Sequence, residues 1–145
     1  MRAVVQRVTS ATVVVGDALV GAIGPGLCAF VGVAPSDDGD AARRMADRLW
    51  HLRVFEDDAG KMNRSAAELG LSVLVVSQFT LYADTSRGRR PSFVGAAPPE
   101  MAEPLVDQVV ARLSELGATV DSGRFREHMA VTLTNDGPVT VVLDT

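Results

Sequence analysis

Two stretches of apolar residues constrain the fold of this chain more than any other feature of its sequence. Leu27–Ala34 is an uninterrupted apolar run of strand length, which predicts a strand that is buried on both faces. Residues 71–82 give the strongest strand signal, centred on Val73–Val76. A β-sheet is therefore expected at the centre of the molecule.

Shorter patterns on either side of these stretches predict further strands and two helices. Apolar residues at helical spacing predict a helix over Asp37–His51, with Ser36 or Asp37 as its N-cap, and a second helix over Pro99–Leu116. More strands are expected over residues 2–9, 11–15, 18–23 and 53–56, and near 119–121, 129–134 and 139–143. This order is typical of an α/β domain in which a mixed sheet packs against two helices, and 145 residues correspond to a single domain.

The composition excludes several classes of protein. The formal net charge is −4, whereas a protein that coats nucleic acid over its whole surface would be basic, so any such contact requires a local patch. Cys28 is the only cysteine and lies in an apolar run, which predicts a buried, unreactive thiol. One cysteine and two histidines nearly exclude a closed zinc site. No signal-peptide core and no membrane-length apolar run is present, so we expect a cytoplasmic protein.

Familiar catalytic and nucleotide-binding motifs are absent or lie in the wrong context. Gly24–Ala29 fits G-x-G-x-x-A, but a strand-like run follows it where a dinucleotide site needs the start of a helix. No P-loop and no G-x-S-x-G nucleophile elbow occurs. His51, at the end of the first predicted helix, and His128, before a predicted strand, are expected to be surface or hydrogen-bonding residues.

The polar end of the strongest predicted strand and the long polar loop over residues 84–98 are two candidates for a site. Ser77-Gln78-Phe79-Thr80 closes the strongest strand with polar residues, and a rigid strand with an open end is a common place for a binding site. The loop itself carries a local basic patch suited to phosphate, with an aromatic face for stacking, formed by Arg87, Arg89, Arg90 and Phe93.

A third segment, Asn135-Asp136-Gly137-Pro138, lies between two predicted strands. These residue types favour tight turns, so propensity alone predicts a plain hairpin turn here.

Taken in order, these segments and others resemble one family over the whole length of the chain. The opening M-R-A-V-V-Q-R-V-T is followed by G-x-I-G-x-G-L, D-x-x-G-K-M-N-x-S, S-Q-F-T-L-Y, R-P-S-F-x-x-A and N-D-G-P-V-T. S-Q-F-T and N-x-G-P-x-T are the two signature motifs of the D-aminoacyl-tRNA deacylases, and the chain is similar to that family. One departure is visible, because the family commonly has glycine after the phenylalanine equivalent to Phe125, where this chain has Arg126-Glu127-His128.

The resemblance implies a fold, an activity and partners. The implied fold is a single deacylase domain over residues 1–145, with partly barrel-like sheet layers and two main helices on one side. The implied enzyme is a homodimer with active sites at the subunit interface. It would hydrolyse the ester at the 3′ end of D-aminoacyl-tRNA, and of glycyl-tRNA mischarged on tRNA-Ala, and would reject L-aminoacyl-tRNA. No cofactor, metal, membrane or DNA partner is implied.

The resemblance also implies roles for individual residues. Ser77, Gln78, Phe79 and Thr80 would form the catalytic motif, with the Phe79 N–H holding the substrate carbonyl oxygen. Gly137 and Pro138, joined by a cis bond, would hold the α-ammonium in the partner's pocket and leave no room for an L side chain. The remaining implied residues are Arg7, which orients those carbonyls, Phe125 and Met129 near the site, Pro91, Ser92 and Phe93 around the terminal adenine, and Arg87, Arg89 and Arg90 on tRNA phosphates.

Some alternatives stay open at this point. Thr80 either positions the substrate or acts as a nucleophile that forms an acyl-enzyme, although no base lies near it in sequence. A threonine-dependent esterase for small esters and an RNA-binding module without turnover are the competing functions. Departure from the family pattern after Phe125 is expected to alter the rim of the site, not the reaction.

Overall fold

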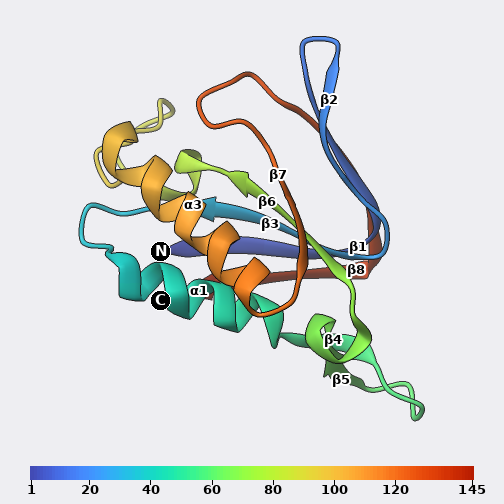
Figure 1. Ribbon diagram of the computed structural model, residues 1–145. Coiled ribbons are helices and arrows are strands. Elements are labelled where there is room, and N and C mark those ends of the chain that lie inside the picture. Colours follow the sequence, from blue (N-terminus) through green and yellow to red (C-terminus); the bar gives the residue numbers. More distant parts are fainter.

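The computed structural model describes residues 1–145 and contains a strongly curved mixed sheet (Figure 1). The strand order is β2-β1-β3-β6-β7, and β8 pairs with β1 along nearly its whole length, from Arg2 to Val14. Strand β3 pairs with β6, and β6 with β7, in parallel, whereas β1 pairs antiparallel with β2, β3 and β8. The strands are β1 (Arg2–Val15), β2 (Ala18–Ile23), β3 (Gly26–Gly32), β6 (Ser72–Ser77), β7 (Thr119–Ser122) and β8 (Ala130–Asp144).

Two long helices cover one face of the sheet, as predicted. Helices α1 (Gly39–Trp50) and α3 (Pro99–Glu115) lie side by side on the same side of the strands (Figure 1). A small hairpin of β4 (Arg53–Glu56) and β5 (Met62–Ser65) extends away from the main body and leads into the short helix α2 (Ala66–Leu69). Sequence patterns missed β5 and α2, which have four residues each and include polar residues such as Asn63 and Arg64 in β5 and Glu68 in α2. None of the helices combines the length and apolar content needed to span a bilayer.

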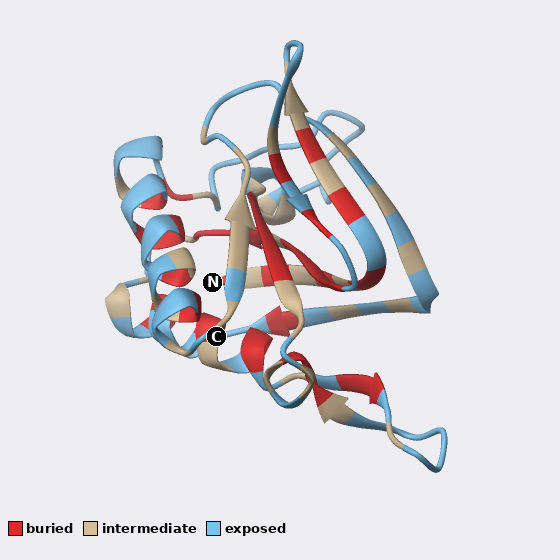
Figure 2. Ribbon diagram, turned by 45° about the vertical axis from the view of Figure 1, so that its right-hand side comes forward, coloured by how far each residue is buried: buried red, intermediate tan, exposed pale blue.

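Side chains of the central strands alternate between two cores. Leu27, Ala29 and Val31 of β3 face the helices within the larger core. Cys28 points to the opposite face, where it packs with Leu74 and residues of β1 in a smaller core. Strand β3 is therefore buried on both faces, as its apolar run predicted (Figure 2).

The Cys28 thiol is buried in the smaller core, and this burial raises its pKa to about 12. Since the thiolate is the nucleophile, we expect no modification of native protein by iodoacetamide at pH 8 over hours, and stoichiometric modification in denaturant. Mass spectrometry of the two samples checks this. Rapid labelling of the native protein would contradict the buried position.

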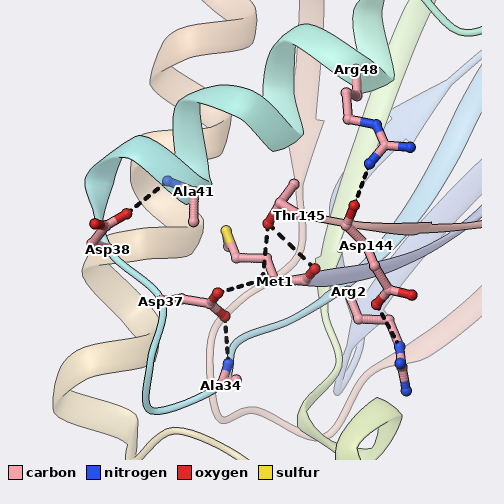
Figure 3. Close-up of polar contacts among 9 residues, drawn as sticks. All are labelled: Met1, Arg2, Ala34, Asp37, Asp38, Ala41, Arg48, Asp144 and Thr145. Carbon is pink, nitrogen blue, oxygen red and sulfur yellow. Dashed lines mark hydrogen bonds and ion pairs between the residues drawn. The ribbon is translucent and has the colours of Figure 1, made fainter.

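The start of α1 differs from the prediction. Its N-cap is Asp38, whose carboxylate accepts a hydrogen bond from the Ala41 N–H at 2.9 Å. Neither Ser36 nor Asp37 takes that role, because Asp37 is engaged elsewhere. Its carboxylate accepts from the Ala34 N–H at 2.7 Å and pairs with the Met1 ammonium group (Figure 3).

The two ends of the chain meet beside α1. The Met1 ammonium also donates to the Thr145 hydroxyl, and the side chain of Arg48 donates to the Asp144 carbonyl (Figure 3). Arg2 pairs with the Asp144 carboxylate at 2.8 Å. These contacts fasten the first residues of β1 and the last residues of β8 to the helical layer.

Two predicted strands have different limits in the structure. The strand predicted over residues 71–82 ends at Ser77, and a 3₁₀ helix, η1 (Phe79–Tyr82), follows it. The Gln78 N–H makes the last hydrogen bond to β3, with the Val31 carbonyl at 2.8 Å, and pairing stops because the chain then turns, the Leu81 N–H donating back to the Gln78 carbonyl. The hairpin turn predicted for residues 135–138 is wrong: β8 runs through this segment beside β1, with two irregularities in register.

Candidate active site at the end of strand β6

A cavity of about 470 Å³ opens where β3 and β6 end and α3 begins. Most of its lining is apolar, and Arg126 is the only charged residue in it. The lining residues are Val31, Val33, Ser77, Gln78, Phe79, Phe93, Ala96, Ala97, Pro98, Pro99, Ala102, Val106, Phe125 and Arg126. An apolar pocket with a few polar groups at one edge is the usual form of a small-molecule site. Predicted site residues in this lining are Ser77, Gln78, Phe79, Phe93 and Phe125.

The turn into η1 leaves backbone donors free at the edge of this cavity. The Phe79 and Thr80 N–H groups begin the 3₁₀ helix and therefore have no acceptor in a preceding turn, and no side chain accepts from them. The Phe79 side chain is 56% exposed and packs edge-on against Phe93, with ring centroids 5.0 Å apart. Free N–H groups beside an aromatic wall suit a carbonyl oxygen that gains negative charge.

The Thr80 hydroxyl has a single side-chain partner, the Gln78 amide, which donates to it. No histidine, lysine or carboxylate forms a hydrogen bond with this hydroxyl, and Thr80 does not line the cavity. A threonine nucleophile needs a base within hydrogen-bond reach. The geometry therefore favours a positioning role for Thr80.

A second, smaller cavity of about 270 Å³ adjoins the first through Ser77, Gln78, Phe79 and Arg126. Its other wall comes from the segment that precedes β8. Glu127, His128 and Met129 contribute to that wall, so the predicted residue Met129 lies close to the predicted catalytic residues Ser77, Gln78 and Phe79. His51, in contrast, ends α1, and its Nδ1 lies 2.9 Å from the Asp47 carbonyl oxygen, as in a capping residue.

Arg126 adopts a left-handed backbone conformation with φ of +63°, and it is the only non-glycine residue in the chain with positive φ. An L residue in this region costs about 1–2 kcal/mol relative to glycine. This conformation explains physically why glycine suits the position at which the sequence departs from the family pattern. The sequence analysis expected this departure at the rim of the site but gave Arg126 no role of its own, and Arg126 lines both cavities.

The basic loop lies beside the larger cavity. A bridge between Asp84 and Ser92 closes its base, and hydrogen bonds from Ser86 lower the pKa of the Asp84 carboxyl. At the other end the Ala97 N–H donates to the Val33 carbonyl at 2.8 Å. Three arginines in it, Arg87, Arg89 and Arg90, are exposed and form no ion pair or hydrogen bond. Phe93 reaches the cavity, whereas Pro91 and Ser92 do not line it.

The Gly137–Pro138 segment lies in a different part of the chain. Its peptide bond is cis, as the resemblance implied, and neither residue lines either cavity. The Asn135 side chain holds the segment by accepting from the Val139 N–H at 2.7 Å and donating to the Val139 carbonyl at 3.1 Å.

Arg7 supports this segment from β1. Its buried guanidinium donates to the Asp136 carbonyl at 2.9 Å and to the Val54 carbonyl at 2.7 Å, and lies 3.3 Å from the Asp136 carboxylate. Arg7 therefore connects three elements, β1, β4 and the centre of β8. Within one chain, Arg7, Gly137 and Pro138 line neither cavity beside the predicted catalytic residues.

Comparison with known proteins gives a consistent family assignment. A family model described as D-Tyr-tRNA(Tyr) deacylase matches residues 4–144. A protein of Nocardia farcinica named D-aminoacyl-tRNA deacylase is 58% identical over 147 residues, which span 99% of this chain and 99% of that protein. One of Roseiflexus with the same name is 56% identical over 144 residues, covering 99% of this chain and 93% of that protein.

Solved structures agree with the fold. A structure titled c-Myc DNA Unwinding Element Binding Protein superposes with a TM-score of 0.93 at 38% identity, covering 100% of this chain and 99% of that chain. A structure described as a probable eukaryotic D-amino acid tRNA deacylase gives a TM-score of 0.85 at 18% identity, covering 99% of this chain and 98% of that one. The second likeness concerns the fold alone.

Proposed function

This chain belongs to the D-Tyr-tRNA(Tyr) deacylase family and is a D-aminoacyl-tRNA deacylase, and we propose that the cavity at the end of β6 is its active site. The observation that carries this proposal is the pair of unpartnered N–H groups of Phe79 and Thr80 at the edge of an apolar cavity. The reaction is hydrolysis of the ester between the amino acid and the terminal ribose of the tRNA.

In the proposed mechanism, water adds to the ester carbonyl and the developing oxyanion accepts a hydrogen bond from the Phe79 N–H. The bond from the carbonyl carbon to the ribose oxygen then breaks, the ribose oxygen takes a proton, and the amino acid and tRNA leave. Thr80, held by Gln78, positions the substrate. The neighbouring ribose hydroxyl of the substrate assists the attack, so no histidine is needed.

The same proposal assigns chiral selection to a second copy of the chain. Arg7 pairs with Leu27, whereas Ser77 pairs with Val31, four residues further along β3. Four residues of strand span about 13 Å, so the Gly137–Pro138 segment cannot reach its own catalytic motif without a large displacement. In a homodimer, this segment of the partner would hold the α-ammonium and exclude an L side chain.

Substrate range and tRNA contacts follow from this arrangement. Glycine has no side chain to exclude, so glycyl-tRNA mischarged on tRNA-Ala is a second proposed substrate. Phe93, with Pro91 and Ser92 behind it, would hold the terminal adenine. The exposed arginines of the loop, Arg87, Arg89 and Arg90, would contact tRNA phosphates. We place the enzyme in the cytoplasm, where aminoacyl-tRNA is used.

The direct test compares release of tyrosine from D-tyrosyl-tRNA and L-tyrosyl-tRNA at equal enzyme concentration. We expect turnover of the D ester at least about 100-fold faster than of the L ester, because exclusion of a side chain prevents productive binding. Equal rates of hydrolysis of the two esters would refute the proposed exclusion of L-aminoacyl-tRNA. Hydrolysis of neither would refute the assigned activity.

The role of Thr80 is tested with Thr80→Ala, and with Thr80→Ser as the control that keeps the hydroxyl. If Thr80 positions the substrate, the alanine variant keeps activity within about 10-fold of the wild type, the order expected for one neutral hydrogen bond. Loss of about 1000-fold or more in alanine but not in serine would identify Thr80 as the nucleophile, as would burst kinetics on chromogenic esters.

A second function is favoured by one observation, the exposed arginine loop of a chain that resembles a protein titled as DNA-binding. If the chain only bound nucleic acid, it would bind tRNA ends without turnover, and replacing Arg87, Arg89 and Arg90 by alanine would remove that binding. Release of free D-amino acid with multiple turnovers separates the deacylase from that alternative.

A further inference from the structure

Arg126 occupies an unusual place in the site. It lies in the wall of both cavities and provides the only charge in the larger one, beside Phe79 and Phe93. The neighbouring carboxylate, Glu127, lines the smaller cavity and does not line the larger one. A single cation thus faces an otherwise uncharged pocket.

Nothing within the chain uses this charge. Arg126 is exposed and has no side-chain hydrogen bond or ion pair, a condition that it shares with Arg44, Arg64, Arg87, Arg89, Arg90 and Arg124, but it is the only one of these that lines the larger cavity. Its left-handed backbone conformation is one that glycine adopts without strain, so the backbone gains nothing from an arginine. The side chain is what this residue contributes.

We infer that Arg126 binds a phosphate at the 3′ end of the tRNA and thereby fixes the terminal nucleotide in the larger cavity. This inference rests on the proposed function and adds a substrate-binding residue to it. Guanidinium matches phosphate oxygens in bidentate geometry, and the adjacent aromatic pair offers a face for the terminal base. Every aminoacyl-tRNA carries this phosphate, whereas only acidic D-amino acids carry a side-chain carboxylate that could take its place.

The test is Arg126→Gly, which removes the charge and relaxes the backbone. With D-tyrosyl-tRNA we expect KM to rise about 10- to 100-fold, the loss expected for one charge-assisted contact, while kcat stays within about twofold. The slope of log(kcat/KM) against log salt concentration should decrease by about 0.7, the value for one phosphate contact on a single strand. Arg126→Lys should recover part of the loss, because it keeps the charge without the bidentate geometry.

Arg124→Ala is the matched control. Arg124 is an exposed arginine two residues earlier that lines neither cavity, so its loss should leave KM and the salt slope unchanged. The melting temperature of Arg126→Gly should equal or exceed that of the wild type, which excludes unfolding as the cause of a raised KM. An unchanged KM and salt slope in Arg126→Gly would overturn the inference.

Two further substrates identify the anion. On D-tyrosyl-adenosine, which has no phosphate, wild type and Arg126→Gly should have the same KM within about twofold. A raised KM confined to D-aspartyl-tRNA would mean that Arg126 binds the amino-acid side chain, and it would overturn the inference that Arg126 binds a phosphate. Turnover of D-tyrosyl-tRNA by the wild type tests the proposed function separately. If that turnover is absent, the Kd of uncharged tRNA for the same variants tests phosphate binding by Arg126, and an unchanged Kd in Arg126→Gly would overturn it.

Discussion

Replacing Arg7 with methionine is expected to lower the free energy of unfolding by about 3 kcal/mol and to remove most deacylase activity. The guanidinium is buried and donates to the Asp136 and Val54 carbonyls, and Val54 is itself buried. Methionine fills a similar volume but leaves these carbonyls without donors. Activity falls because Asp136 directly precedes the Gly137–Pro138 segment. Urea unfolding and D-tyrosyl-tRNA hydrolysis measure the two effects.

A matched control is available on the same strand. Arg2→Met also removes an ion pair, with Asp144, but both side chains there are largely exposed. Exposed pairs contribute at most about 1 kcal/mol, so Arg2→Met should be nearly neutral. Arg7→Lys should recover little, since one ammonium cannot reproduce two fixed donors aimed at separate carbonyls. A loss of at most about 1 kcal/mol in Arg7→Met, as small as that expected for Arg2→Met, would show that the Arg7 network is not structurally important.

The central strands could be predicted from sequence because their signal is local. The apolar run around Cys28 requires burial on both faces, and the structure provides one core on each side of β3. The stripe that includes Met45 and Leu49 likewise specifies the face of α1 that meets the core. Periodicity of side chains fixes these elements without knowledge of their partners.

The end of β6 and the course of β8 could not be predicted in the same way. Strand β6 ends at Ser77 because the chain turns into η1 after the last hydrogen bond to β3, and the partner strand is far away in sequence. Residues 135–138 favour a turn locally, but pairing with the long β1 carries the chain on, and Arg7 and Asn135 satisfy the groups that the irregular backbone leaves free. Tertiary contacts outweigh local propensity at both places.

The candidate site was identified more by resemblance to family motifs than by physical reasoning from single residues. Resemblance identified Ser77–Thr80, and the structure adds a reason, the free N–H groups of the first turn of η1. The departure at Arg126 was expected at the rim of the site, but its left-handed backbone and its charge in the cavity lining were not predicted, because composition and spacing specify neither φ nor the lining of a cavity. Whether the partner's Gly137 and Pro138 complete the site depends on a second copy of the chain, which one sequence cannot place.

Gly137→Ala is expected to reduce kcat/KM for D-tyrosyl-tRNA by about 100-fold or more, the loss that a displacement of about 1 Å produces in a positioned site. Gly137 has φ of +147°, and an added Cβ would lie 2.7 Å from the Val139 nitrogen and from its Cγ2. Because Asn135 holds Val139 in place through two hydrogen bonds, the Gly137 and Pro138 carbonyls must move instead. Steady-state kinetics on D- and L-tyrosyl-tRNA measure the loss.

Gly60→Ala provides the control for backbone strain alone. Gly60 also has positive φ, +73°, but lies in the β4–β5 turn with open space around it. It should lose about 1 kcal/mol of stability and keep its activity. Wild-type kcat/KM in Gly137→Ala would mean that the segment does not contact the substrate.

Mixing two inactive variants tests whether the segment acts on the partner's cavity. Phe79→Pro removes the proposed oxyanion donor but not the Gly137 segment, and proline is tolerated at the first position of a helix. When it is co-expressed with Gly137→Ala, half of the dimers contain one chain of each kind. In each mixed dimer, the Gly137→Ala chain keeps the Phe79 N–H and the Phe79→Pro chain supplies an unaltered Gly137 segment to it, so one of the two cavities is complete. Activity should return to about a quarter of the wild type, since one site in four is then complete. If both parts acted within one chain, no mixed dimer would contain a complete site, and activity would stay at the level of the separate variants.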